Sequence, residues 1–286
     1  MGSSHRYTPD STATRVALWR AMHLIHDAKP PILNDPLGIK LIAPPEDWQN
    51  RPDMHAEGTK PFRASIVARA RFVEDYVMQS YHAGIHQYVV LGSGIDTFAQ
   101  RQLENVPHLQ IFEVEKAETL AWKKMRLAEE GYPLPPQVHY VGFNFETTGH
   151  SWVKEIIKNG FDIKKPMVAT SIGVSMYLSH EAIKKTLNDL KQFAIGSKFI
   201  MTFMLPLEDV DLQDRIGYER SLKGAQASGT PFISFFKPAD MLNLARSVGF
   251  ENLEHLSTVD IVDKYFKNRT DHLRPSTGEE FLIITV

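Results

Sequence analysis

Short apolar runs alternate with longer amphipathic stretches along the chain after residue 87. The runs have the length of buried strands, and they lie at 87–92, 110–115, 138–143, 167–172 and 198–205. Helical spacing of apolar residues falls at about 97–105, 116–131, 148–159, 179–195 and 238–248. This alternation predicts an α/β fold, in which helices cover both faces of a parallel sheet. Two late runs, 252–260 and 280–286, leave little room for crossover helices, so we expect an antiparallel edge on a mainly parallel, seven-stranded sheet.

Two of these helices carry recognisable end signals. Ser179 has the residue type and position of an N-cap, and Gly249 is expected to end the helix at 238–248. The predicted inner face of the helix that begins after Ser179 contains Ile183, Leu187, Leu190 and Ala194.

The first 82 residues have a different pattern. A helix is predicted at about 12–28, and the proline pairs at 30–31 and 44–45 should divide the residues after it into short helices and turns. The stretch 62–82 predicts an amphipathic helix, whose Arg63 and Arg71 are expected at the surface or in ion pairs. We expect a single domain over 1–286, with the helical region 1–82 as one lid over a core at 83–286.

A second lid is expected from an insertion at about 206–237, because long segments over the edge of a sheet often cover a site. It contains the aromatic residues Tyr218, Phe232, Phe235 and Phe236. These side chains either line an acceptor site or close a small core of their own, and the sequence leaves both possibilities open.

Composition narrows the classes of function. The formal net charge of −2 argues against a general nucleic-acid-binding protein. The chain has no cysteine, which excludes disulfides and thiolate metal sites, and its 12 histidines show no metal-binding spacing. No apolar run approaches the roughly 18 residues that span a bilayer. We therefore expect no metal, no nucleic-acid or membrane partner, and a cytoplasmic protein.

The segment VVLGSGIDT, at 89–97, predicts a strand that enters a Gly-x-Gly turn and then a helix. Glycine permits positive φ and close approach of a ligand to the backbone. Glu113 and Glu115 end the next strand, where carboxylates can accept hydrogen bonds from ribose hydroxyls. The pattern indicates a nucleoside. A dinucleotide is disfavoured because Thr97 replaces the third glycine and Asp96 would repel pyrophosphate.

Six segments resemble, in order, motifs of the leucine carboxyl methyltransferase family of class I methyltransferases. They are ILNDPLGIKLI (32–42), ARARFVEDYV (68–77), VVLGSGIDTFAQR (89–101), IFEVEKAETLAWKK (111–124), VGFNF (141–145) and PMVATSIGVSMYLSHEAI (166–183). The resemblance covers about residues 12–195. It implies a Rossmann-like fold and S-adenosyl-L-methionine as cofactor, with S-adenosyl-L-homocysteine as product.

The resemblance also implies roles for matching positions. Arg69 should hold the carboxylate of the cofactor, and the turn Gly92-Ser93-Gly94 with Asp96 should line its methionine part. Glu115, with Glu113 on the same strand, takes the place of the ribose-binding acid. Asn144 and Phe145 lie where an Asp-Leu pair meets the adenine in the family.

Three positions depart from the family pattern. Glu115 and Asn144 each stand where the family has Asp. Ile172, before Gly173, replaces a glutamate that helps to hold the cofactor in relatives. Ser171, Thr170 and Ser175 are the nearby polar side chains that could compensate, and Ser171 is included among the expected cofactor contacts.

A sulfonium methyl group is already activated, so the enzyme mainly aligns donor and acceptor and excludes water. A carboxylate acceptor needs no general base, whereas a hydroxyl acceptor does. Tyr177 and His180 are the candidates on the acceptor side. The function we expect is O-methylation of a small natural-product-type acceptor. The alternatives are methylation of a protein C-terminal carboxylate and a non-catalytic nucleoside-binding scaffold.

Overall fold

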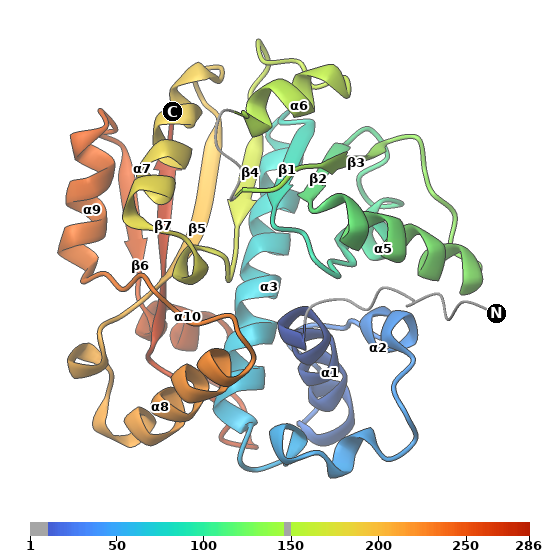
Figure 1. The fold of residues 1–286 in the computed structure, drawn as a ribbon, viewed down its shortest axis with the longest axis vertical. Helices are drawn as coiled ribbons and strands as arrows, with labels where there is room; N and C mark the ends of the chain where they lie inside the picture. Colours follow the sequence, from blue (N-terminus) through green and yellow to red (C-terminus); the bar gives the residue numbers. More distant parts are fainter. Residues whose placement is uncertain (1–10, 146–149) are drawn as a thin grey trace.

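Seven strands form one sheet in the computed structural model, which describes residues 11–145 and 150–286 (Figure 1). The sheet order is β3-β2-β1-β4-β5-β7-β6. The strands are β1 (Gln87–Leu91), β2 (Gln110–Glu115), β3 (Val138–Gly142), β4 (Val168–Ser171), β5 (Lys198–Met204), β6 (Leu253–Leu256) and β7 (Glu279–Thr285). Strands β1 to β5 are parallel, whereas β7 is antiparallel to both β5 and β6. The predicted mainly parallel sheet with an antiparallel edge is confirmed.

Helices connect and cover these strands. Over the described residues they are α1 (Ser11–His26), α2 (Leu37–Ile42), α3 (Lys60–His82), α4 (Phe98–Gln102), α5 (Ala117–Glu129), α6 (Trp152–Lys158), α7 (His180–Asp189), α8 (Leu212–Ala227), α9 (Pro238–Ser247) and α10 (Thr258–Tyr265). Ser179 caps α7 by accepting a hydrogen bond from the Ala182 amide, and Gly249 follows α9 with a φ of +102°. Both predicted helix ends are therefore confirmed.

The core has a separate hydrophobic cluster on each face of the sheet. One joins the strands to α6, α7 and α9, and it includes Trp152, Leu187 and Met241. The other joins them to α3, α4 and α10, and Val67 and Phe98 belong to it. Strand residues alternate between the two clusters, as the period of two along a strand requires.

The order of the strands reverses at β1, which lies between β2 and β4. Chain connections that leave β1 and β4 turn to opposite faces, so they open a crevice at the carboxyl edge of the sheet. Helices α1, α2 and α8 lie beyond this edge, in the lower part of Figure 1. The two regions expected as lids thus lie at the same end of the molecule as the glycine turn.

One expectation needs correction. Residues 257–260 do not extend strand β6, because Ser257 and Asp260 form a capping box that starts α10. Of the two settings expected for Arg63, the structure shows the ion pair: its side chain is 1% exposed and pairs with Asp27. Arg71 is exposed and pairs with Asp75 on the same helix, as expected. Part of the predicted helix at 148–159 lies outside the described residues, and α6 accounts for the rest.

Candidate functional site

The glycine turn follows β1 directly and needs both of its glycines. Gly92 has a φ of +73° and Gly94 a φ of +49°, in the left-handed region that favours glycine. A Cβ on Gly92 would lie 2.6 Å from Cγ2 of Val174, so the turn packs tightly on the segment after β4. The Gly92 amide donates to the Val114 carbonyl of β2 over 2.9 Å. The turn is therefore fixed between the ends of three neighbouring strands.

Glu115 lies beside this turn, whereas Glu113 does not. The Gly94 amide donates to Oε2 of Glu115 over 3.0 Å. Glu113 is fully buried and accepts a hydrogen bond of 2.5 Å from Nζ of Lys123. Burial raises the pKa of Glu113, although Lys123 opposes this effect. Glu115 therefore lies at the glycine turn, whereas Glu113 forms an ion pair in the core.

Ser93 and Asp96 complete the turn in different ways. Oδ1 of Asp96 accepts a hydrogen bond of 2.9 Å from the Phe98 amide, so this carboxylate orients the start of α4. Oγ of Ser93 is buried and has no hydrogen-bond partner among the residues that the structure describes. A buried hydroxyl without a partner lowers the stability of the fold, and a hydrogen bond from a ligand would remove that cost. The Ser93 hydroxyl is therefore a candidate contact for a ligand at this edge.

Arg69 lies on α3 against the backbone at Gly173. Gly173 has a φ of +69°, and a Cβ there would be 2.7 Å from Nη2 of Arg69. Nη1 of Arg69 donates to both carboxylate oxygens of Glu279, each over 2.9 Å. The two side chains are 14% and 12% exposed, respectively. This ion pair joins α3 to β7 next to the loop that contacts the glycine turn.

The polar residues near Ile172 are mostly engaged elsewhere. Ile172 packs against the hydrophobic cluster on the α3 face. Oγ1 of Thr170 lies 3.2 Å from the hydroxyl of Tyr88, and Ser175 donates to the Thr202 carbonyl over 2.7 Å. Ser171 is buried at the end of β4. Thr170 and Ser175 are thus engaged in other contacts, and Ser171 has no side-chain hydrogen bond to the residues at 11–145 and 150–286.

The adenine positions follow β3. Asn144 is exposed just beyond the strand, and Phe145 is half-buried. The Phe145 ring contacts the edge of Phe143, with 5.0 Å between the ring centroids. This arrangement leaves an amide and an aromatic surface at the same edge of the sheet as Glu115.

A pocket that is partly open to solvent lies between the sheet edge and the helices beyond it. Its wall is mostly apolar and aromatic, with contributions from α1, α3, the loop after β4, α8 and the segment before β7. The side chains that set its character are Arg15, Val16, Trp19, Phe62, Ile66, Arg69, Met176, Tyr177, Met204, Tyr218, Phe232 and Glu279. Both regions expected as lids therefore contribute to one pocket.

Of the two candidate catalytic residues, the structure brings only Tyr177 to the pocket. Tyr177 lines it, and its ring meets the edge of Phe232 at 5.3 Å between centroids. His180 is exposed at the start of α7 and stacks on Phe236, with the ring centroids 4.4 Å apart. Phe236 is itself buried in the core. The aromatic residues of the insertion thus divide, some lining the pocket and some extending the core.

Helix α8 is fixed over the pocket by a buried carboxylate. Asp214 accepts hydrogen bonds from both terminal nitrogens of Arg274, at 3.0 and 2.7 Å. It also accepts bonds from the amide and hydroxyl of Thr277, each at 3.1 Å. Because residues 274–277 lead directly into Glu279, the same segment connects α8 to the Arg69 ion pair.

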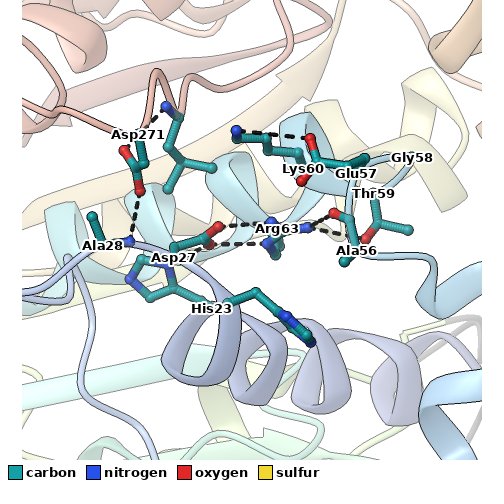
Figure 2. A network of polar contacts seen from close by, with 12 residues as sticks. His23, Asp27, Ala28, Ala56, Glu57, Gly58, Thr59, Lys60, Arg63 and Asp271 are labelled. Atoms are coloured by element: carbon teal, nitrogen blue, oxygen red, sulfur yellow. Dashed lines mark hydrogen bonds and ion pairs between the residues drawn. The ribbon is translucent and has the colours of Figure 1, made fainter.

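Helix α1 and the residues after it, here called the N-terminal cover, are held by a second polar cluster, centred on Arg63 (Figure 2). Nε and Nη2 of Arg63 donate to the two oxygens of Asp27 over 2.9 and 2.7 Å. His23 binds Asp27 through Nδ1 at 2.8 Å and accepts from the Ile32 amide through Nε2. Burial alone would raise the pKa of Asp27, but these hydrogen bonds hold it below its ordinary value. The cluster joins the end of α1 to α3.

Arg15 and Glu279 line the pocket but are not among the site residues that the sequence predicts. Arg15 belongs to a stripe on α1, with Thr12, Val16 and Trp19, that has helical spacing. The sequence contains that signal for Arg15. The sequence contains no such signal for Glu279, because this residue begins the last strand and reaches the pocket only through the pairing of β7 in the sheet.

Among residues 11–145 and 150–286, no group of three or more His, Asp or Glu side chains could hold a metal ion. In the same part of the chain, no helix is both long enough and apolar enough to cross a bilayer.

Comparison with known proteins gives consistent matches. The Leucine carboxyl methyltransferase family model matches residues 13–191. YktD of Bacillus subtilis (strain 168), provisionally named an S-adenosyl-L-methionine-dependent methyltransferase, is 32% identical over 212 residues, which are 72% of this chain and 67% of YktD. A similarly named protein of Mycolicibacterium smegmatis (strain ATCC 700084 / mc(2)155) is 28% identical and covers 71% of this chain and 69% of its own.

Solved structures share the fold at low identity. A provisionally named methyltransferase from Thermobifida fusca YX aligns with a TM-score of 0.60 at 15% identity, covering 97% of this chain and 95% of its own. A DUF574 family protein from Streptomyces avermitilis aligns with a TM-score of 0.59 at 15% identity and covers 97% of both chains. The sheet and its helices therefore have the class I methyltransferase arrangement.

Proposed function

Because the chain belongs to the leucine carboxyl methyltransferase family of S-adenosyl-L-methionine-dependent methyltransferases, we propose that it methylates an oxygen of a small, largely apolar acceptor. The acceptor oxygen belongs to a carboxylate or a hydroxyl of a natural-product-type molecule. One observation carries the proposal: an aromatic-lined pocket lies beside Arg69 and Gly173, under α1 and α8.

The residues at the sheet edge fit the cofactor. The unpaired Ser93 hydroxyl and the positive-φ glycines offer polar contacts and room for close approach. Glu115 would hold the ribose, Asn144 and Phe145 the adenine, and Arg69 the carboxylate of the methionine part. When bound, S-adenosyl-L-methionine supplies a methyl group that needs no further activation.

The chain's own contribution is alignment and exclusion of water. Methyl transfer is an in-line displacement, so a correctly oriented acceptor accounts for most of the achievable acceleration. The aromatic wall made by Trp19, Phe62 and Phe232 would hold an apolar acceptor, while α1 and α8 limit access of water. Tyr177 contributes one of the pocket hydroxyls and could relay a proton from a hydroxyl acceptor. A carboxylate acceptor would need no such step.

The covered pocket favours a small acceptor over a protein C-terminus. A protein chain end would have to enter between α1 and α8, which are tied to the core by the Arg63 and Asp214 clusters. A small molecule can lie entirely inside the pocket, so α1 and α8 need not stay apart while it is bound. The family description, which names a leucine carboxyl group, makes peptides that end in leucine the natural comparison.

The test has two stages. Calorimetry with S-adenosyl-L-methionine, S-adenosyl-L-homocysteine and NAD should show saturable binding of the first two alone. Transfer of labelled methyl is then measured to a panel of aromatic and aliphatic carboxylic acids and phenols, and to peptides ending in leucine. Transfer to small acceptors supports the proposal, whereas exclusive transfer to the peptides contradicts it. Tight cofactor binding without transfer to any acceptor would favour a non-catalytic scaffold.

A further inference from the structure

Arg15 lies at the mouth of the acceptor pocket, between two covering helices. It belongs to the pocket-facing stripe of α1, and its Cζ lies 6.0 Å from the ring centroid of Trp19. Its Nη1 lies 3.9 Å from the place that a Cβ on Gly224 of α8 would occupy. The guanidinium therefore spans the gap between α1 and α8, with its side chain 21% exposed.

Among the residues that the structure describes, the hydrogen-bonding capacity of the Arg15 guanidinium is largely unused. Nε of Arg15 is buried and has no hydrogen-bond partner among the described residues. Its acidic neighbour is Asp53, whose Oδ2 lies 3.5 Å from Nε, too far for a good hydrogen bond. Arg51 already binds both oxygens of Asp53, at 2.9 and 2.7 Å. Asp53 therefore binds mainly Arg51 and forms no good hydrogen bond with Arg15.

The second arginine of the pocket differs in this respect. Arg69 is matched by Glu279, which places both carboxylate oxygens 2.9 Å from Nη1. With this pair neutralised and most of the remaining wall apolar, Arg15 leaves the pocket with an unbalanced positive charge. A half-buried guanidinium with free donors, stacked near an aromatic ring, favours an anionic oxygen group as its partner.

We propose that Arg15 is a specificity-determining residue that binds an anionic oxygen group, in the simplest case a carboxylate, on the methyl acceptor. This inference rests on the proposed function, because it assumes that the pocket receives the acceptor. It narrows the acceptor to an aromatic or aliphatic molecule that carries a negative charge. The cofactor remains with Arg69 and the glycine turn.

A matched pair of fluorescent probes tests the charge preference directly. Anilinonaphthalene sulfonate is an apolar anion, and N-phenylnaphthylamine is its neutral analogue without the sulfonate. Binding of each is measured to the full-length protein saturated with S-adenosyl-L-homocysteine, for wild type, Arg15→Gln and Arg220→Gln. Arg220 is exposed on α8 and does not line the pocket, so its variant removes the same charge from the same region.

The wild type should bind the anion at least about tenfold more tightly than the neutral probe, as one charge-assisted hydrogen bond allows. Arg15→Gln should remove most of this difference, and Arg220→Gln should keep it. A wild type that does not prefer the anion, or a preference that survives in Arg15→Gln, would overturn the proposal.

Calorimetry with S-adenosyl-L-homocysteine separates this inference from the proposed function. Arg15→Gln should bind S-adenosyl-L-homocysteine as the wild type does and remain folded, as judged by its urea midpoint. A parallel loss of cofactor affinity would place Arg15 on the cofactor side and overturn its role toward the acceptor. A wild type that binds no cofactor would contradict the proposed function instead.

Discussion

The edge proposed for the cofactor and the pocket proposed for the acceptor adjoin each other but are built differently. The cofactor edge consists of the turn after β1 and the ends of β2 and β3, and it depends on backbone conformation at Gly92 and Gly94. The acceptor pocket is assembled from side chains on α1, α3, α8 and β7, which are far apart in the sequence. The edge is thus part of the rigid sheet, whereas the pocket depends on the ion pairs that hold its covers.

This difference suggests how the two regions can vary. A substitution at the edge alters the backbone that is proposed to bind the cofactor, so few substitutions there are compatible with methyl transfer. A change in the covers alters only the shape and charge of the pocket. The same sheet can therefore accept different molecules through changes in α1 and α8.

The largest effect should come from breaking the cluster that holds the N-terminal cover. Arg63→Met keeps most of the side-chain volume but leaves Asp27 buried without its cationic partner. We expect a loss of about 3–5 kcal/mol in the free energy of unfolding, measured by urea denaturation. The matched control is Arg71→Met on the same helix, which removes an exposed pair with Asp75 and should cost under about 1 kcal/mol. Equal losses in both variants would contradict a structural role for the buried cluster.

The next effect should be confined to the cofactor edge. Gly94→Val introduces a β-branched side chain at a φ of +49°. The protein leaves room for its Cβ, because the nearest atom, Cβ of Ala13, is 3.7 Å away. The side chain would occupy the space by which a ligand approaches the turn. We expect calorimetry to show roughly 100-fold weaker binding of S-adenosyl-L-methionine, which corresponds to about 2.7 kcal/mol.

Gly131→Val controls for backbone strain in this comparison. Gly131 has a φ of +74° and no neighbouring atom within 4 Å of the place that a Cβ would occupy, but it lies after α5, away from the site. Its substitution should lower stability by a similar amount and leave cofactor affinity unchanged. Loss of cofactor binding in both variants would mean that strain, not obstruction, is responsible.

The same contrast explains how much can be predicted from the sequence. All seven strands and the glycine turn are predictable because each is encoded by a contiguous run of residues with its own periodicity. The partner of Arg69 is not predictable in this way, because Glu279 is 210 residues away and reaches it only through the antiparallel pairing of β7. Glu113 and Glu115 look equivalent in sequence, and only the position of Lys123 on α5 separates them.

Local signals are also missed where a broader pattern dominates the interpretation. The capping box of Ser257 and Asp260 is present in the sequence, but the apolar run around it suggests a longer strand. The charge of Arg63 is compatible with either exposure or an ion pair, and only its position on α3, facing the end of α1, selects the buried pair. Burial of a charged residue depends on the partner that meets it, which neither periodicity nor composition specifies.

A smaller effect, limited to the acceptor side, should result from loosening α8. Asp214→Asn keeps the shape of the side chain but removes the charge that binds Arg274 and Thr277. We expect faster amide exchange in α8 and, because α8 is held less firmly over the pocket, weaker binding of anilinonaphthalene sulfonate by up to about tenfold. Cofactor affinity should not change. Asp263→Asn, at an exposed position on α10, is the control and should behave as the wild type.

The smallest effect concerns acid stability and tests the buried Asp27 cluster against the exposed Arg71–Asp75 pair. The pKa of Asp27 is held below its ordinary value of 3.8, so the folded state binds protons less readily there than the unfolded chain does. The resulting stabilisation is fully present above about pH 4 and is lost as the pH falls through the lowered pKa. Each unit of lowering corresponds to about 1.4 kcal/mol.

Arg63→Met should therefore show a shallower decline in the free energy of unfolding below pH 4 than the wild type, because one of the groups that lower the pKa of Asp27 is gone. Arg71→Met should retain the wild-type slope, since Arg71 does not contact Asp27. Urea denaturation at several pH values between about 5 and 3 measures the difference, and the other carboxylates cancel between variants. Parallel curves for all three proteins would mean that Asp27 does not govern the acid response of the N-terminal cover.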